Sequence, residues 1–320
     1  MGRLAQTLGG IGNSVSSPSQ QVREVFLVPQ DIHASTEQLL GQVRDDVGEL
    51  LTIAESFAES LQGVIRTLSI PFQYTYSQVH SLHWQRAHIA ERIRGGGAPD
   101  DAHQAEIDRA KAKAKFDEHL RGEGGKQLAD EVVERLLQLK SERESLAAAR
   151  ELTRQGLVLT WSAVEVFARD TFVYLLNRQP QLSDALLSDP FNKKRFATDR
   201  VEWQTLAGYG FDLSEKLGTY LISKADLSNV PAIRAAYTAI FPAAEELRNC
   251  LLDQRLWHLS QKRHLIVHRR GIADKAYLDA TGSGLKIGET LWVSPSEVED
   301  AIEAVLVLGS KLLAQVTNAA

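Results

Sequence analysis

Apolar side chains recur every three to four residues along almost the whole of this chain, and that spacing is the strongest constraint on its fold. Such a repeat places apolar residues on one face of an α-helix, which must then pack against other helices. The one clear exception is the stretch Leu285–Val293. We therefore expect a mainly α protein, with a small β-hairpin over 285–293. The types and spacing of Ser294, Pro295 and Glu297 predict that the last helix begins just after this hairpin.

Composition narrows the class of protein further. Of the 320 residues, 43% are hydrophobic and 24% are charged, which excludes a disordered chain. The single cysteine, Cys250, allows no intrachain disulfide and no thiolate cluster for a metal. The two most apolar stretches, 156–168 and 301–316, are interrupted by polar residues and too short to span a bilayer. We therefore expect a soluble, cytoplasmic protein without a secretory signal or membrane contact.

Glycine clusters and a change in composition divide the chain. We expect a mobile tail over 1–22 and, over 23–148, a helical, coiled-coil-like extension. Gly95–Gly97 and Gly122–Gly125 bracket a charged arm over 95–125. A helical bundle is expected over 149–320, because a broad apolar stripe begins there. That stripe consists of Leu157, Trp161, Val164, Ala168, Phe172 and Leu175.

The segment Arg248–Lys275 carries an unusual local charge. It contains seven Lys or Arg residues and two acids, giving +5, whereas the whole chain has a formal charge of −5. The segment also contains three histidines. In an acidic protein, such a concentration is the electrostatic footprint of a polyanion site. A basic helix surface balanced by acidic neighbours is the other interpretation.

Arg263 lies in the apolar stripe of the helix expected over 243–270. A guanidinium that faces a core must meet a carboxylate, a phosphate or a hydrated subunit boundary. Glu165, at the edge of the stripe that begins near Leu157, is the nearest acidic candidate. A purely structural Arg263–Glu165 pair is one possible outcome. The stripe around Arg263 is formed by Leu252, Leu256, Leu259 and Ile266.

His264 and His268 share another face of the same helix. An i, i+4 histidine pair can bind a metal, but no third ligand accompanies it in the sequence and the neighbouring cations would repel one. Acid–base chemistry is the alternative. Arg263 and His268 lie about 140° apart on a straight helix. They would converge only if two copies paired across a twofold axis or if the helix bent near Gly271.

The run from Arg263 to His268, followed by Arg269-Arg270-Gly271 and Tyr277, resembles the Arg-x4–6-His motif of the HEPN superfamily. These all-helical domains occur in bacterial toxins, CRISPR effectors and other defence ribonucleases. A long first helix containing Trp161–Phe167, a motif late in the domain and a closing helix are similar to the RiboL-PSP-like group. The resemblance covers about 149–320.

The resemblance implies a metal-independent endoribonuclease without a cofactor, with a composite site on a homodimer. His268 would be the general base or acid for attack by the RNA 2′-hydroxyl, which leaves a 2′,3′-cyclic phosphate. Arg263 would hold the scissile phosphate and stabilise its charge in the transition state. His264 would orient or supplement these two residues, and Glu165 matches the acidic residue that many members carry on the first helix.

The resemblance also suggests partners. Lys262, Arg269 and Arg270 are candidates for holding flanking RNA phosphates. A defence or toxin-type effector is implied, in which an antitoxin or a defence-system partner docks on the N-terminal region. The rival hypothesis is a non-catalytic HEPN-like module that binds RNA, a nucleotide or a protein without cutting.

Overall fold

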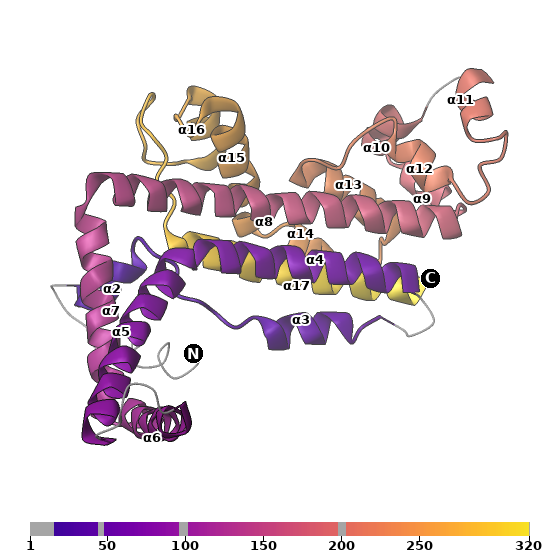
Figure 1. The fold of residues 1–320 in the computed structure, drawn as a ribbon. Coiled ribbons are helices and arrows are strands. Elements are labelled where there is room, and N and C mark those ends of the chain that lie inside the picture. Colours follow the sequence, from indigo (N-terminus) through magenta and orange to yellow (C-terminus); the bar gives the residue numbers. More distant parts are fainter. Residues whose placement is uncertain (1–15, 44–47, 96–101, 198–202, 320) are drawn as a thin grey trace. The chain divides into compact units, whose positions relative to one another are not determined.

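The computed structural model describes residues 16–43, 48–95, 102–197 and 203–319, and most of these residues are helical (Figure 1). This confirms the mainly α class. None of the described helices is both long and apolar enough to cross a membrane. The helices are α2 (Pro18–Arg23), α3 (His33–Leu40), α4 (Gly48–Leu68), α5 (Ile70–Gly95), α6 (Ala102–Arg121), α7 (Glu123–Ser141), α8 (Arg143–Arg178), α9 (Leu182–Ser188), α10 (Pro190–Phe196), α11 (Trp203–Gly208), α12 (Leu217–Ile222), α13 (Val230–Ile240), α14 (Glu245–Leu251), α15 (Gln254–Arg269), α16 (Lys275–Thr281) and α17 (Pro295–Ala319).

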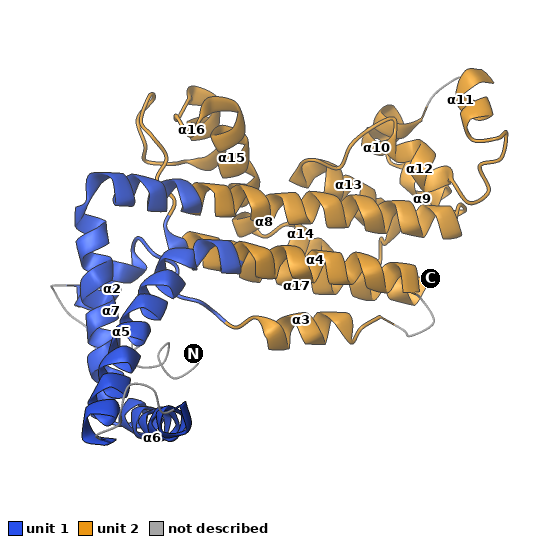
Figure 2. Ribbon diagram, viewed as in Figure 1, with its two compact units in different colours: residues 1–30, 65–152, 294–296 blue, residues 31–64, 153–293, 297–320 orange. Residues whose placement is uncertain are grey.

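The chain divides into two compact units, coloured separately in Figure 2. Unit 1 contains residues 1–30, 65–152 and 294–296, and unit 2 contains residues 31–64, 153–293 and 297–320. The division within α8 lies close to the change in composition seen in the sequence. Residues 31–64, however, cluster with the C-terminal part of the chain and not with the N-terminal region in which the sequence analysis placed them.

Aromatic packing explains why residues 31–64 belong to unit 2. The rings of Phe57 on α4 and Phe167 on α8 stack with their centroids 4.3 Å apart. On α17, a Cβ at Gly309 would lie 2.4 Å from the Phe57 ring, so only glycine lets α17 approach this closely. These contacts join α4, α8 and α17, which run side by side in Figure 1. Such long-range packing has no signature in the local apolar spacing.

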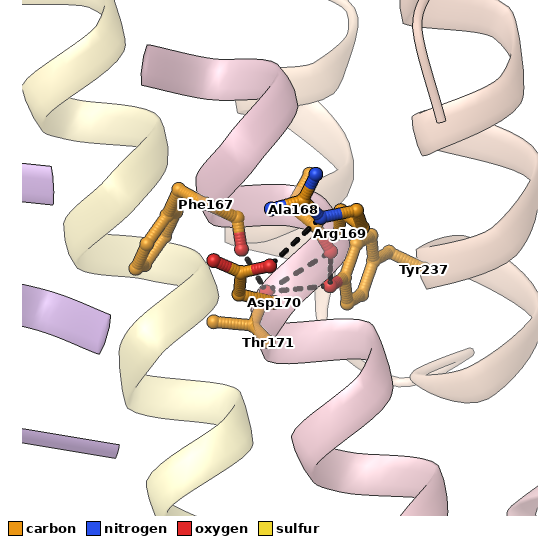
Figure 3. A network of polar contacts seen from close by, with 6 residues as sticks. All are labelled: Phe167, Ala168, Arg169, Asp170, Thr171 and Tyr237. Carbon is orange, nitrogen blue, oxygen red and sulfur yellow. Dashed lines mark hydrogen bonds and ion pairs between the residues drawn. The ribbon is translucent and has the colours of Figure 1, made fainter. Parts of the chain in front are cut away.

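A buried polar network attaches α13 to α8 (Figure 3). The Tyr237 hydroxyl lies 2.7 Å from Thr171 Oγ1 and donates to the Ala168 carbonyl at 2.7 Å. Thr171 donates in turn to the Phe167 carbonyl at 2.6 Å. Thr171 and Tyr237 are fully buried. Every hydroxyl in the network therefore has a partner, as a buried polar group requires.

Burial raises the pKa of Tyr237 far above its ordinary value. Because the folded state holds the proton more tightly than the unfolded state, Tyr237 contributes stability below its unfolded pKa, and this contribution is lost as the pH rises beyond it. We expect the free energy of unfolding to fall above about pH 10. In Tyr237→Phe, the part of this decrease in unfolding free energy that comes from Tyr237 should be absent. Urea denaturation of both proteins at several alkaline pH values measures this; parallel pH profiles would contradict it.

Unit 1 has its own hydrophobic core, which α2, α5, α7 and the start of α8 enclose. Ser17 caps α2, because its side chain accepts from the backbone N–H of Gln20, and Pro18 occupies the first turn. Residues 18–22, which the sequence predicted to be part of a mobile tail, belong to α2, and Val22 is buried; residues 1–15 lie outside the described part. The buried core residues are Val22, Val25, Phe26, Val28, Phe72, Val79, Leu128, Val132, Val133, Leu136 and Ala149.

The predicted β-hairpin over 285–293 is wrong. In the described residues, the only β-type pairing is an isolated antiparallel bridge between Ile272 and Thr290. The segment after Gly288 therefore pairs with the residues that follow α15 and not with its own neighbours. Leu291 N donates to the Gly271 carbonyl at 2.7 Å, and Ala273 exchanges 2.8 Å hydrogen bonds with residues 288 and 289. Gly288, at φ +87°, makes the turn that permits this.

Candidate functional site

The helix that carries the motif is shorter than the sequence indicated. The continuous helix expected over 243–270 is broken at Leu252, and α15 begins after Asp253, whose carboxylate accepts from the backbone N–H of Arg255 at 2.8 Å. At the other end, Arg270 adopts φ +55°, and the N–H groups of Arg270 and Gly271 bond to the Leu265 carbonyl. The motif residues 263–268 therefore lie on one regular helix.

Arg263 and Glu165 are in contact, as the helical positions suggested. Arg263 Nη2 donates to Glu165 Oε2 at 3.3 Å, and Trp161 Nε1 donates to Glu165 Oε1 at 2.7 Å. The side chains of Arg263 and Glu165 are 23% and 19% exposed, whereas Trp161 is only 1% exposed. Arg263 Nε is buried and has no hydrogen-bond partner among the described residues. A half-buried cation and carboxylate thus join α15 to α8.

The two histidines of the motif lie together on the outside of α15. His264 and His268 are exposed, and their ring centroids are 4.6 Å apart. In the described parts of the chain, no three side chains of His, Cys, Asp or Glu are grouped so that they could hold a metal ion. The pair therefore has no third ligand there, and imidazoles exposed to solvent in this way can transfer protons.

One chain does not bring Arg263 and His268 to the same point. Helix α15 continues to Arg269, so the bend expected near Gly271 comes after both residues. They therefore face directions about 140° apart on one helix. His264 follows Arg263 directly and lies against His268. The three side chains therefore extend around the helix, from the half-buried Arg263–Glu165 ion pair to the solvent-exposed histidines.

Carboxylates partner most of the basic cluster. Lys262 bonds to Glu297 and is mostly buried, so this candidate for RNA contact is engaged elsewhere. Arg269 pairs with Asp274 at 3.2 Å but remains 64% exposed, and Arg270 is exposed. The positive excess is therefore concentrated at the end of α15. The ion pairs of the cluster are Arg248–Glu245, Arg255–Asp253, Lys262–Glu297, Arg263–Glu165 and Arg269–Asp274.

The structure adds a basic residue that sequence reasoning missed. Arg154, near the start of the unit 2 part of α8, donates from Nη1 to the Arg270 carbonyl at 3.4 Å. It precedes Glu165 by eleven residues, about three helical turns, so the two residues share one face of α8. The spacing in the sequence therefore indicates that Arg154 lies on the same side of α8 as Glu165. Arg154 brings a third guanidinium to the basic end of α15, beside those of Arg269 and Arg270.

Comparison of this chain with protein-family models, curated proteins and solved structures finds no match.

Proposed function

We propose that unit 2 is a HEPN-type endoribonuclease that cleaves RNA without a metal ion and leaves a 2′,3′-cyclic phosphate. The observation that carries the proposal is the contact of Arg263 on α15 with Glu165 on α8, beside two exposed imidazoles on α15. It joins the two sequence segments on which the resemblance rests. Arg263 and Glu165 are 98 residues apart in the sequence.

Arg263 supplies the positive charge for the scissile phosphate. A guanidinium carries five N–H donors, and the contact with Glu165 uses one Nη2 donor. Glu165 is fixed by the buried Trp161, so the orientation of the cation is set before any substrate arrives. A preorganised cation of this kind stabilises the charge that develops on a phosphate in the transition state.

His268 supplies the proton transfer. Its exposed imidazole takes the proton from the 2′-hydroxyl as that oxygen attacks phosphorus; the bond to the 5′-oxygen breaks, and the 5′-oxygen takes a proton from water to leave as a 5′-hydroxyl. His264 lies against His268 and supports its orientation. Two copies of unit 2, related by a twofold axis, would place Arg263 of each beside His268 of the other. Arg269, Arg270 and the neighbouring Arg154 then flank the RNA backbone.

The same ion pair supports a second function, in which unit 2 binds RNA or a protein without cutting. In this case Arg263–Glu165 is a structural pair, and breaking a half-buried pair destabilises the domain. Ion pairing across the basic cluster favours this alternative, because it leaves less charge for a substrate. Replacing the exposed His268 distinguishes the two functions, because only the cleavage function requires this imidazole.

Product chemistry tests the proposal. The purified chain is incubated with total RNA and with tRNA in EDTA, and the ends of the products are identified. We expect 2′,3′-cyclic phosphate and 5′-hydroxyl ends, and a dimeric species by analytical ultracentrifugation. Ends bearing a 3′-hydroxyl and a 5′-phosphate would contradict the mechanism. RNA that is bound but left intact would favour the binding function. If cleavage began only after a partner bound unit 1, that partner would be a regulator.

A further inference from the structure

Unit 1 contains a cavity of about 390 Å³ between α5 and α6. This volume lies within the range of small-molecule binding sites. The cavity exists because small side chains meet where the two helices pack: Ala87 and Ala90 on α5, and Ala112 on α6. Phe116 also lines the cavity and is itself buried. The lining therefore includes apolar side chains and one aromatic ring.

The walls of the cavity are cationic. Arg86 and Arg94 on α5 and Lys115 on α6 line it, against one carboxylate, Glu91. Three cations and one carboxylate give a formal charge of +2 with the histidines neutral. Both His83 and His119 also reach the cavity. Concentrated charge of one sign in a partly apolar cavity focuses the field on a ligand of the opposite sign.

Glu91 holds two of these cations in place. It is only 7% exposed, and its carboxylate accepts from Arg94 Nη1 at 2.5 Å and from Lys115 Nζ at 2.8 Å. These contacts use one donor of each cation, and the remaining N–H groups are available to a further acceptor. The buried carboxylate thus positions an arginine and a lysine at the cavity wall without occupying all their donors.

Arg86 completes the set. Its side chain is exposed, lines the cavity and forms no ion pair with any described carboxylate. A lining that combines cations with apolar and aromatic side chains matches a ligand with an anionic group and a flat apolar part. The geometry points to a binding site for a small phosphate-bearing ligand of the nucleoside phosphate class, held by Arg86, Arg94 and Lys115 in the cavity that Phe116 also lines. This site is independent of the activity proposed for unit 2.

Isothermal titration of the full chain with ADP, inorganic pyrophosphate and adenosine tests the site. We expect ADP and pyrophosphate to bind and adenosine not to bind. Arg86→Ala should weaken both interactions at least about tenfold, because a charge-assisted contact to phosphate is lost. Lys115→Ala should have a similar effect. Since Arg86 is exposed and not ion paired to a described carboxylate, its variant should fold normally, which thermal melting verifies.

Arg92→Ala is the matched control. Arg92 lies on the same helix, is exposed and does not line the cavity, so its removal should leave ADP affinity unchanged. An equal loss in Arg92→Ala and Arg86→Ala would show that general surface charge attracts the probes, and would overturn the proposal. The proposal would also be overturned if neither ADP nor pyrophosphate bound, or if adenosine bound as tightly as ADP.

Discussion

Replacing His268 by alanine should lower the rate of RNA cleavage about 100- to 10,000-fold, the range that a general acid–base residue contributes. His268 is exposed, so the variant should unfold at the same urea concentration as the unchanged protein. The measurement is the initial rate on one defined tRNA in EDTA, with circular dichroism to verify folding. A folded His268→Ala protein with an unchanged rate would remove His268 from the mechanism.

Arg263→Ala should lower the same rate about 100- to 1,000-fold, the usual effect of removing one preorganised donor. Unlike His268→Ala, it should also destabilise unit 2, because Glu165 loses its cation while remaining mostly buried. Arg263→Lys keeps the charge but loses the planar fork, so it should recover stability more than activity. Full activity in a folded Arg263→Ala protein would mean that the ion pair is purely structural.

His258 provides the matched control on the same helix. It is half-buried and lines a separate cavity of about 190 Å³ with Lys262 and Glu297. His258→Ala should therefore cleave RNA at the unchanged rate. If His258→Ala and His268→Ala lost activity equally, the loss would reflect damage to α15 as a whole and not a role of one imidazole.

Trp161→Ala should reduce the free energy of unfolding of unit 2 by about 3–5 kcal/mol, the cost of removing a large buried aromatic side chain. Trp161 is 1% exposed and is among the largest fully buried side chains of the chain. The variant loses both the packing of the indole and its hydrogen bond to Glu165. Urea denaturation followed by circular dichroism measures the change.

Trp161→Phe separates the loss of packing from the loss of the hydrogen bond, and Trp203→Ala serves as a control. Trp161→Phe keeps most of the volume but removes the indole N–H, so it should cost about 1–3 kcal/mol and loosen Glu165. Trp203→Ala is the control, because Trp203 is 74% exposed and its removal should change stability by less than about 0.5 kcal/mol. Equal destabilisation by Trp161→Ala and Trp203→Ala would contradict the assigned core.

The parts of this structure that depend on helical periodicity could be predicted from the sequence. The mainly α class follows from apolar spacing alone. The Arg263–Glu165 contact was predictable because each residue lies on or beside an apolar stripe, and two stripes must face each other for their helices to pack. The same reasoning, applied to the basic residues of α8, would also have found Arg154.

The parts that depend on long-range packing could not be predicted. Nothing local in residues 31–64 indicates that α4 packs on Phe167, since any amphipathic helix offers a similar face. The stretch 285–293 departs from helical spacing and was predicted to form a hairpin. Its pairing partner is instead the segment at Ile272, because the backbone turns at Gly288. The break in the helix at Leu252 involves neither glycine nor proline, so the sequence offered only the cap at Asp253 as a signal.

The backbone pairing that follows α15 has a consequence for recognition at its basic end. Terminal helical turns ordinarily fray, and a ligand that binds there must first order them. Here the bonds from Gly271 and Ala273 to residues 288–291 fasten the chain immediately beyond Arg269 and Arg270. The entropy lost in ordering this turn is lost on folding and not on association. A polyanion docking at this end would therefore meet a backbone that is already ordered, and more of its contact energy would be retained as affinity.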